Sequence, residues 1–219
     1  MTLKILIGPS SFAESDKTPL GRLIASGYEV IDNPYKRKMT KAELSMLLKE
    51  DVVGILAGLE PLDREVLLSS RLKVISRVGA GMSNVDLKAA RELNIAVFNT
   101  PDGPTTAVAE LTIGAMLSLL RSIPQSDNAL HERKWARKMG GQIEGKTIAI
   151  IGFGRIGRRV AELLSLFRAK LVAVDPYLER SAILHCLLLS KDEALSQADI
   201  ITIHTSGDEC LFNEDAFSV

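Results

Sequence analysis

The sequence predicts an α/β fold in which parallel β-sheets are covered by helices on both faces. Three observations lead to this fold class: short apolar runs rich in β-branched residues, amphipathic helical stretches between them, and a glycine-rich turn between one such run and the next helix. The chain has 219 residues, of which 46% are hydrophobic and 25% charged. This is enough to build one large domain or two small ones.

The first half of the chain alternates strand and helix patterns in a regular way. We expect strands at 3–8, 28–31, 53–56, 73–76 and 95–98, and helices near 18–26, 40–49, 63–69 and 86–93. Continuous apolar strands that alternate with amphipathic helices are typical of a parallel sheet with both faces covered.

A concentrated turn signal, NTPDGP at 99–104, marks the expected domain boundary, with one domain over 1–102 and a second over 103–219. The second domain is predicted to start with a long helix from about Thr105 to Arg121, interrupted by Pro124 and resuming toward Trp135. Further strands are expected at 147–151, 171–174, 186–189 and 200–204, with a last helical turn at 213–217. A doubly wound nucleotide domain has two βαβαβ halves, and only the first half plus one strand is expected here.

Charge and cysteine content exclude several classes of protein. The 27 basic and 27 acidic side chains balance, so the chain lacks the basic surface of a nucleic-acid binder. We interpret the densest basic run, 133–138, as a solvated or interfacial face. Two cysteines, Cys186 and Cys210, are too few for a disulfide framework and predict a reducing, cytoplasmic setting. The start MTLKILIGPS does not match a signal peptide, and the apolar run 111–120 is about half a bilayer span, so we expect no membrane role.

The run TIAIIGFGRIGRRVAELL carries the strongest motif of the chain. Gly152 permits a tight turn out of the strand, Gly154 lets the backbone approach a pyrophosphate, and Gly157 lets the helix pack closely on the strand. The amides of Arg155 and Ile156 would then point at the phosphates from the helix N-terminus. A plain strand-to-helix turn is the alternative, but the strand before and the helix after favour a dinucleotide site.

An acidic residue follows at the end of the next strand. Asp175, in LVAVDPY, stands about where a carboxylate accepts hydrogen bonds from an adenine-ribose diol. Its charge would repel a 2'-phosphate, and the next residues, Pro176 and Tyr177, supply no cation. NAD is therefore predicted over NADP, although Arg180 lies close enough in sequence to leave NADP open.

Four runs together resemble the D-isomer-specific 2-hydroxyacid dehydrogenases, and within them most closely the D-3-phosphoglycerate dehydrogenase branch: GKTIAIIGFGRIGRRVAELL…KLVAVDPY, RVGAGMSNVDLKAARELNIAVFNTP, TTAVAELTIGAMLSLLRSIPQ and ADIITIHTS. The resemblance covers nearly the whole chain and is strongest from about residue 73 to 206. It implies a flavodoxin-like substrate domain, an incomplete Rossmann domain that binds NAD, and hydride transfer between NAD and a 2-hydroxy or 2-keto acid.

The resemblance also places the substrate. Arg77, Ala80 and Gly81 would bind its carboxylate, since amides with small side chains leave room for a planar group. A common glycine-rich turn and a surface arginine are the alternatives. The family's phosphate-binding arginine has no counterpart in GILAG at 54–58, which argues against phosphoglycerate. Ser83 stands where the family usually has an aspartate, so we expect a less rigidly tied loop.

Two further positions take their meaning from the resemblance. Thr205 matches a family cofactor contact, although Ser206 replaces the usual proline, and we interpret the adjacent His204 as a structural residue at a strand end rather than a general base. Trp135 lies in a segment that packs at the subunit interface in the family, which implies a homodimer. Packing of Trp135 in its own core is the alternative.

Hydride transfer needs a base and a cation beside the substrate. The family supplies an arginine, a glutamate and a histidine, and the resemblance would place all three beyond Val219. His131 and His185 lie in unsuitable contexts, so we assign no catalytic residue. Three interpretations stay open: a dehydrogenase completed by a second polypeptide or by a continuation of the reading frame, a non-catalytic NAD-binding or dimerisation fragment, and a remnant that does not fold stably.

Overall fold

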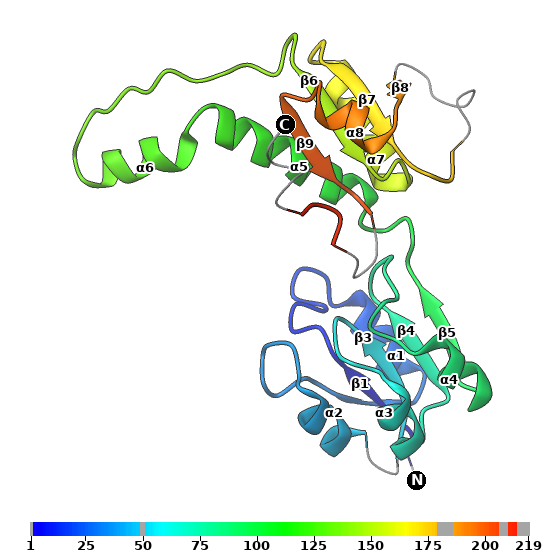
Figure 1. Ribbon diagram of the computed structural model, residues 1–219. Helices are drawn as coiled ribbons and strands as arrows, with labels where there is room; N and C mark the ends of the chain where they lie inside the picture. Colours follow the sequence, from blue (N-terminus) through cyan, green and yellow to red (C-terminus); the bar gives the residue numbers. More distant parts are fainter. Residues whose placement is uncertain (1, 49–50, 179–185, 206–209, 214–219) are drawn as a thin grey trace. The chain divides into compact units, whose positions relative to one another are not determined.

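The computed structural model describes residues 2–48, 51–178, 186–205 and 210–213. The chain divides into two compact units, Met1–Gly103 and Pro104–Val219. Each unit is built on its own sheet of parallel strands with helices packed against it (Figure 1). The predicted α/β class with parallel sheets is confirmed.

The amino-terminal unit contains a five-stranded sheet in the order β2-β1-β3-β4-β5. Its strands are β1 (Lys4–Ile7), β2 (Glu29–Ile31), β3 (Val52–Ala57), β4 (Val74–Arg77) and β5 (Ala96–Asn99), and its helices are α1 (Thr18–Ala25), α2 (Lys41–Leu47), α3 (Arg64–Ser69) and α4 (Leu87–Glu92). This strand order is the flavodoxin-like one, and its direction of winding reverses between β1 and β3.

Short polar side chains fix where three helices of this unit begin. Thr40 and Glu43 form a capping box at α2, while the carboxylates of Asp63 and Asp86 accept hydrogen bonds from backbone amides in the first turns of α3 and α4. The helices then bury their apolar faces against the central strands, where Ile55 of β3 pairs with Ile75 of β4. The core therefore lies around the middle of the sheet.

The carboxy-terminal unit contains a four-stranded sheet in the order β8-β7-β6-β9, which matches the 3-2-1-4 order of a doubly wound domain. Its strands are β6 (Thr147–Ile151), β7 (Lys170–Val174), β8 (Cys186–Leu188) and β9 (Ile200–Ile203), and its helices are α5 (Thr105–Leu120), α6 (Ile123–His131), α7 (Arg155–Ser165) and α8 (Lys191–Leu195). α5 and α7 pack on one face around Ile148 and Leu164, and Ala194 of α8 packs on the other face against Val172.

Two helix predictions in this unit need correction. The break after α5 lies at Ser122, whose φ of 51° ends the helical path, and Pro124 stands in the first turn of α6, where a proline is tolerated. α6 ends at His131, so Trp135 is not helical. The short α8 was not predicted, although its capping box of Ser190 and Glu193 is readable in the sequence. The helical turn expected at 213–217 lies, apart from Asn213, outside the described residues.

In the part of the chain that the structure covers, no single helix is both long and apolar enough to cross a membrane. α5 and α6 meet that criterion only together, across a bend of 65°. α5 buries Ala109, Ile113 and Met116 within the unit.

Candidate functional site

The glycine-rich turn joins β6 to α7 at the carboxyl edge of the four-stranded sheet. Gly152 has a φ of +90°, which residues with a side chain rarely adopt, and a Cβ placed there would lie 2.7 Å from Thr205 Cγ2 and 2.9 Å from the His204 oxygen. A Cβ on Gly157 would collide with the carbonyl oxygen of Gly152. Glycine is therefore required at 157 if α7 is to pack this closely on β6, and at 152 if the turn is to keep this φ beside the end of β9.

The start of α7 is open toward its surroundings. Gly154 is the N-cap residue, none of the described side chains caps the helix, and space is free where a Cβ of Gly154 would stand. Arg155 and Ile156 are the first two residues of the helix, so their amides belong to the first turn, where the helix dipole favours anions. The arrangement has the features that a bound pyrophosphate needs.

Asp175 follows the last residue of β7 and reaches back to this turn. Its Oδ2 accepts a hydrogen bond from the Phe153 amide at 2.9 Å, and its Oδ1 accepts one from the Tyr177 amide at 3.0 Å. The sequence predicted a ribose acceptor at Asp175 but not these two contacts, which tie the end of β7 to the glycine turn. A carboxylate has further lone pairs, so it can still accept from a diol.

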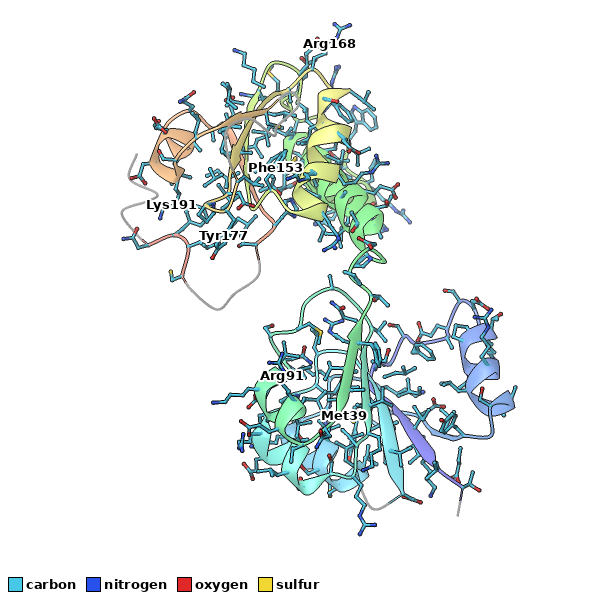
Figure 2. All side chains as sticks on the ribbon, turned by 90° about the vertical axis from the view of Figure 1, so that its right-hand side faces the viewer. Met39, Arg91, Phe153, Arg168, Tyr177 and Lys191 are labelled. Atoms are coloured by element: carbon cyan, nitrogen blue, oxygen red, sulfur yellow. The ribbon has the colours of Figure 1, made fainter. Side chains whose placement is uncertain are left out.

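A cavity of about 850 Å³ opens at the same edge of the sheet. It is lined by the glycine turn, by Asp175 and Tyr177 after β7, by Lys191 after β8, and by Thr205 after β9. Figure 2 labels Tyr177 and Lys191 on this unit. Its volume lies in the range of small-molecule and cofactor sites. Sequence reasoning missed Tyr177 and Lys191, although both follow strands whose carboxyl ends must meet at this edge.

His204 also lines the cavity, and its ring is already engaged. Its Nε2 lies 2.9 Å from the Thr202 hydroxyl, and partial burial lowers the pKa of His204 below its ordinary value of 6.5. Both facts fit a neutral structural residue. His131 is exposed, with Nδ1 3.0 Å from the Asp127 carbonyl oxygen, and His185 lies outside the described residues.

A second group of site residues lies in the amino-terminal unit, in the loop after β4. Arg77 ends this strand, and its Nη1 donates to the carbonyl oxygen of Val78. The guanidinium lies against Gly79, whose φ is +136°, and a Cβ on that residue would collide with it. Among the described residues nothing accepts a hydrogen bond from the buried Nε of Arg77.

The amides of this loop divide into two kinds. Val78 donates to the Ala57 oxygen and Gly79 to the Thr100 hydroxyl, both at 2.8 Å. The amides of Ala80 and Gly81 donate to no acceptor in the described ranges. Spare amides at Ala80 and Gly81, together with an Arg77 Nε that lacks an acceptor, are what a carboxylate ligand could satisfy.

Residues 113–218 match the model of the D-isomer-specific 2-hydroxyacid dehydrogenase NAD-binding domain. These residues belong to the NAD-binding domain of the D-isomer-specific 2-hydroxyacid dehydrogenase family. The cofactor of this dehydrogenase domain is NAD. The glycine turn, Asp175 and the cavity all lie within the matched residues.

Individual proteins and solved structures are also similar to the chain. The D-3-phosphoglycerate dehydrogenase of Homo sapiens is 37% identical over 184 residues, which cover 82% of this chain and 34% of that protein. The crystal structure of the TT0316 protein from Thermus thermophilus is 29% identical with a TM-score of 0.82, covering 94% of this chain and 66% of that one. NAD⁺-bound 3-phosphoglycerate dehydrogenase from Entamoeba histolytica has a TM-score of 0.75 at 26% identity, covering 95% and 64%. The chain spans about a third of the length of the curated relatives it matches.

Proposed function

We propose that this chain supplies the NAD site and the substrate-carboxylate site of a dehydrogenase that transfers a hydride between NAD and a 2-hydroxy acid. The observation that carries the proposal is the loop from Arg77 to Gly81. It offers two amides and a buried guanidinium nitrogen that find no acceptor in the described parts of the chain. A 2-hydroxy or 2-keto acid brings a planar carboxylate that can accept from the two amides, and the Arg77 guanidinium beside Gly79 supplies a positive charge.

On the cofactor side, the residues have separate roles. Gly152, Gly154 and Gly157 keep the turn open to a pyrophosphate, and the amides of Arg155 and Ile156 bind its oxygens. The Asp175 carboxylate accepts from the adenine-ribose hydroxyls and repels a 2'-phosphate, while Thr205 closes the cavity beside Gly152. Bound NAD accepts or delivers the hydride.

On the substrate side, the end of β3 argues for an acid without a phosphate group. Ala57, the last residue of that strand, supplies no cation, and Val78 already donates to its oxygen. We assign carboxylate binding to Arg77, Ala80 and Gly81. No residue of this chain is assigned to the exchange of the substrate hydroxyl proton.

Two measurements on the purified chain test this function. Titration with NADH, followed by its fluorescence, should show saturable binding, and a panel of 2-keto acids should perturb the NMR signals of the Ala80 and Gly81 amides. Absence of NADH binding would refute the proposal. Turnover of NADH by the chain alone would show that one of its residues exchanges the proton, and would overturn that part of the proposal. Binding without turnover favours the second interpretation, a non-catalytic NAD-binding fragment.

We also propose that the chain forms a homodimer through α6 and the segment 132–142. α6 and this segment stand away from the sheet of their unit (Figure 1). Within the segment, Trp135 is 85% exposed and Met139 is 100% exposed, so Trp135 does not pack into its own core. Large apolar side chains displayed together on an extended segment favour a protein partner.

A separately encoded polypeptide is a further proposed partner. β9 is an edge strand of the described sheet, and Ile201 and Ile203 are exposed on it. An open apolar edge of this kind can be extended by another strand. We further propose a cytoplasmic location, since Cys186 and Cys210 are free thiols.

A further inference from the structure

A buried carboxylate lies at the carboxyl edge of the amino-terminal sheet. Glu60, in the turn after β3, is 2% exposed, and its Oε2 accepts a hydrogen bond from the Gly58 amide at 2.5 Å. The carboxylate also fills the space over the end of β1, because a Cβ on Gly8 would lie 2.5 Å from Oε2. Burying a carboxylate is costly unless it is hydrogen-bonded. This one sits where the strand order reverses, the place at which such sheets bind ligands.

One side chain from the loop over 78–84, which we call the substrate loop, is hydrogen-bonded to the turn that contains Glu60. The Nδ2 of Asn84 donates to the carbonyl oxygens of Glu60 at 2.8 Å and Gly58 at 3.2 Å. The main-chain oxygen of Asn84 in turn accepts from the Leu62 amide at 2.8 Å. Asn84 therefore joins the end of the substrate loop to the turn over 58–62.

The beginning of the same loop is joined to the strands on either side. Val78 donates to the Ala57 oxygen on β3, and the Asn99 side chain donates to the Ala80 oxygen at 2.9 Å from β5. The exposed Ser83 makes none of these contacts, and at the end of the loop it is the neighbouring Asn84 that bonds to the turn over 58–62. The amides of Ala80 and Gly81, which have no acceptor among the described residues, lie between the contact of Val78 with β3 and the contacts of Asn84 with the 58–62 turn.

We propose that Glu60 and Asn84 are positioning residues that hold the loop over 78–84 in the shape that binds the substrate carboxylate. Glu60 holds the 58–62 turn in place by accepting a hydrogen bond from the Gly58 amide. Asn84 donates to two carbonyl oxygens of that turn, so the position of the turn determines the position of the end of the loop. The inference rests on the proposed role of Ala80 and Gly81. It adds two residues that touch neither substrate nor NAD.

The test uses Asn84→Asp, which keeps the shape of the side chain but replaces both donors by an acceptor that faces two carbonyl oxygens. The probe is oxalate, which mimics the planar carboxylate and carbonyl of a 2-keto acid, and the readout is the NMR shift of the Ala80 and Gly81 amides. We expect the Kd for oxalate to rise about tenfold or more. The Kd for NADH should not change, because its site lies in the other unit.

Asn33→Asp is the matched control. The Asn33 side chain, like that of the partly buried Asn84, donates to two main-chain oxygens, those of Gly8 at 2.7 Å and Arg37 at 2.8 Å, but it does not contact the loop. A merely structural effect would lower the melting temperature in both variants and weaken oxalate binding in both. A positioning role weakens it in Asn84→Asp alone.

Glu60→Gln provides a second variant in case Asn84→Asp does not fold. It keeps an acceptor for the Gly58 amide but removes the charge, so we expect a smaller rise in the Kd for oxalate and faster hydrogen exchange at residues 78–83. The exposed Glu65→Gln is its control. Unchanged oxalate binding in the folded variants refutes the positioning role alone. A wild-type chain that binds NADH but no oxalate or 2-keto acid refutes the proposed substrate site itself.

Discussion

Single residues in this protein carry more than one role, and Asp175 is the clearest case. The spacing from the glycine turn assigns its carboxylate to the cofactor, whereas the structure shows both oxygens accepting main-chain amides, from Phe153 and Tyr177. The carboxylate therefore shapes the turn as well as marking its ligand. Charge-assisted hydrogen bonds to amides are among the stronger ones in proteins.

Substituting Asp175 should remove both roles at once. We expect Asp175→Ala to weaken NAD binding by about tenfold or more, because the ribose acceptor is lost and the Phe153 amide loses its partner. The preference for NAD over NADP should fall as well, since the repulsion of a 2'-phosphate disappears. Fluorescence titrations with both cofactors measure this. Asp192→Ala, an exposed aspartate on α8, is the control, and unchanged NAD affinity in Asp175→Ala would contradict the assignment.

The pKa of His204 makes a prediction about stability. Burial lowers the pKa of this imidazole in the folded state, so the unfolded chain takes up the proton first as the pH falls. The stabilising contribution of neutral His204 is complete above its ordinary value of 6.5 and is lost as the pH drops below it toward the lower folded value. Denaturation melts from about pH 7.5 to about pH 5 should show a smaller loss of stability for His204→Gln than for the wild type. Equal losses would contradict it.

At the scale of elements, the sequence predicts the strands and the helices of the amino-terminal unit well, and it misses the short α8 and the break between α5 and α6. The run TIAII, for example, is a strand over Thr147–Ile151, as expected. A strand in the middle of a parallel sheet is covered by helices on both faces, so its residues form a continuous apolar run. α8 has only five residues, too few for a helical period to be visible, and only its capping box marks it. The break between α5 and α6 depends on the positive φ of Ser122, which cannot be predicted from the residue types at this point of the sequence.

The residues of the candidate site also divide into those that the local sequence predicts and those that only the fold brings together. Gly152, Gly157 and Asp175 are predictable because their chemistry is local to one strand, one turn and one helix. Glu60 and Asn84 are not, since the two are far apart in sequence and meet only because β3 and β4 pair side by side. Lys191 enters the cavity in the same way, through the pairing of β7 and β8.

The contact between β6 and α7 gives a prediction at this scale. In Gly157→Ala the added Cβ would meet the Gly152 oxygen, so α7 must move away from the strand. We expect a loss of about 1–3 kcal/mol in the unfolding free energy, together with weaker NADH binding. Gly114→Ala, in the middle of α5 with open space at its Cβ, is the control and should be neutral or stabilising by about 0.5–1 kcal/mol. Denaturant unfolding measures both, and equal effects would contradict the close approach.

At the scale of the whole molecule, the two units have separate cores and separate tasks. One core surrounds Ile55 and Ile75, and the other surrounds Ile148 and Leu164. The proposed carboxylate site belongs to the first unit and the NAD cavity to the second. The exposed segment 132–142 belongs to the second unit, so self-association should depend on the NAD-binding unit and not on the substrate loop.

Self-association through this segment can be tested directly. Trp135 and Met139 are the large apolar side chains that an interface would bury, and a buried tryptophan often dominates the binding energy. We expect the wild-type chain to sediment as a dimer and the Trp135→Ser, Met139→Ser double variant as a monomer, with NADH affinity retained. The exposed Ile24→Ser on α1 is a control that should stay dimeric. A monomeric wild type, or a double variant that remains dimeric, would contradict an interface at this segment.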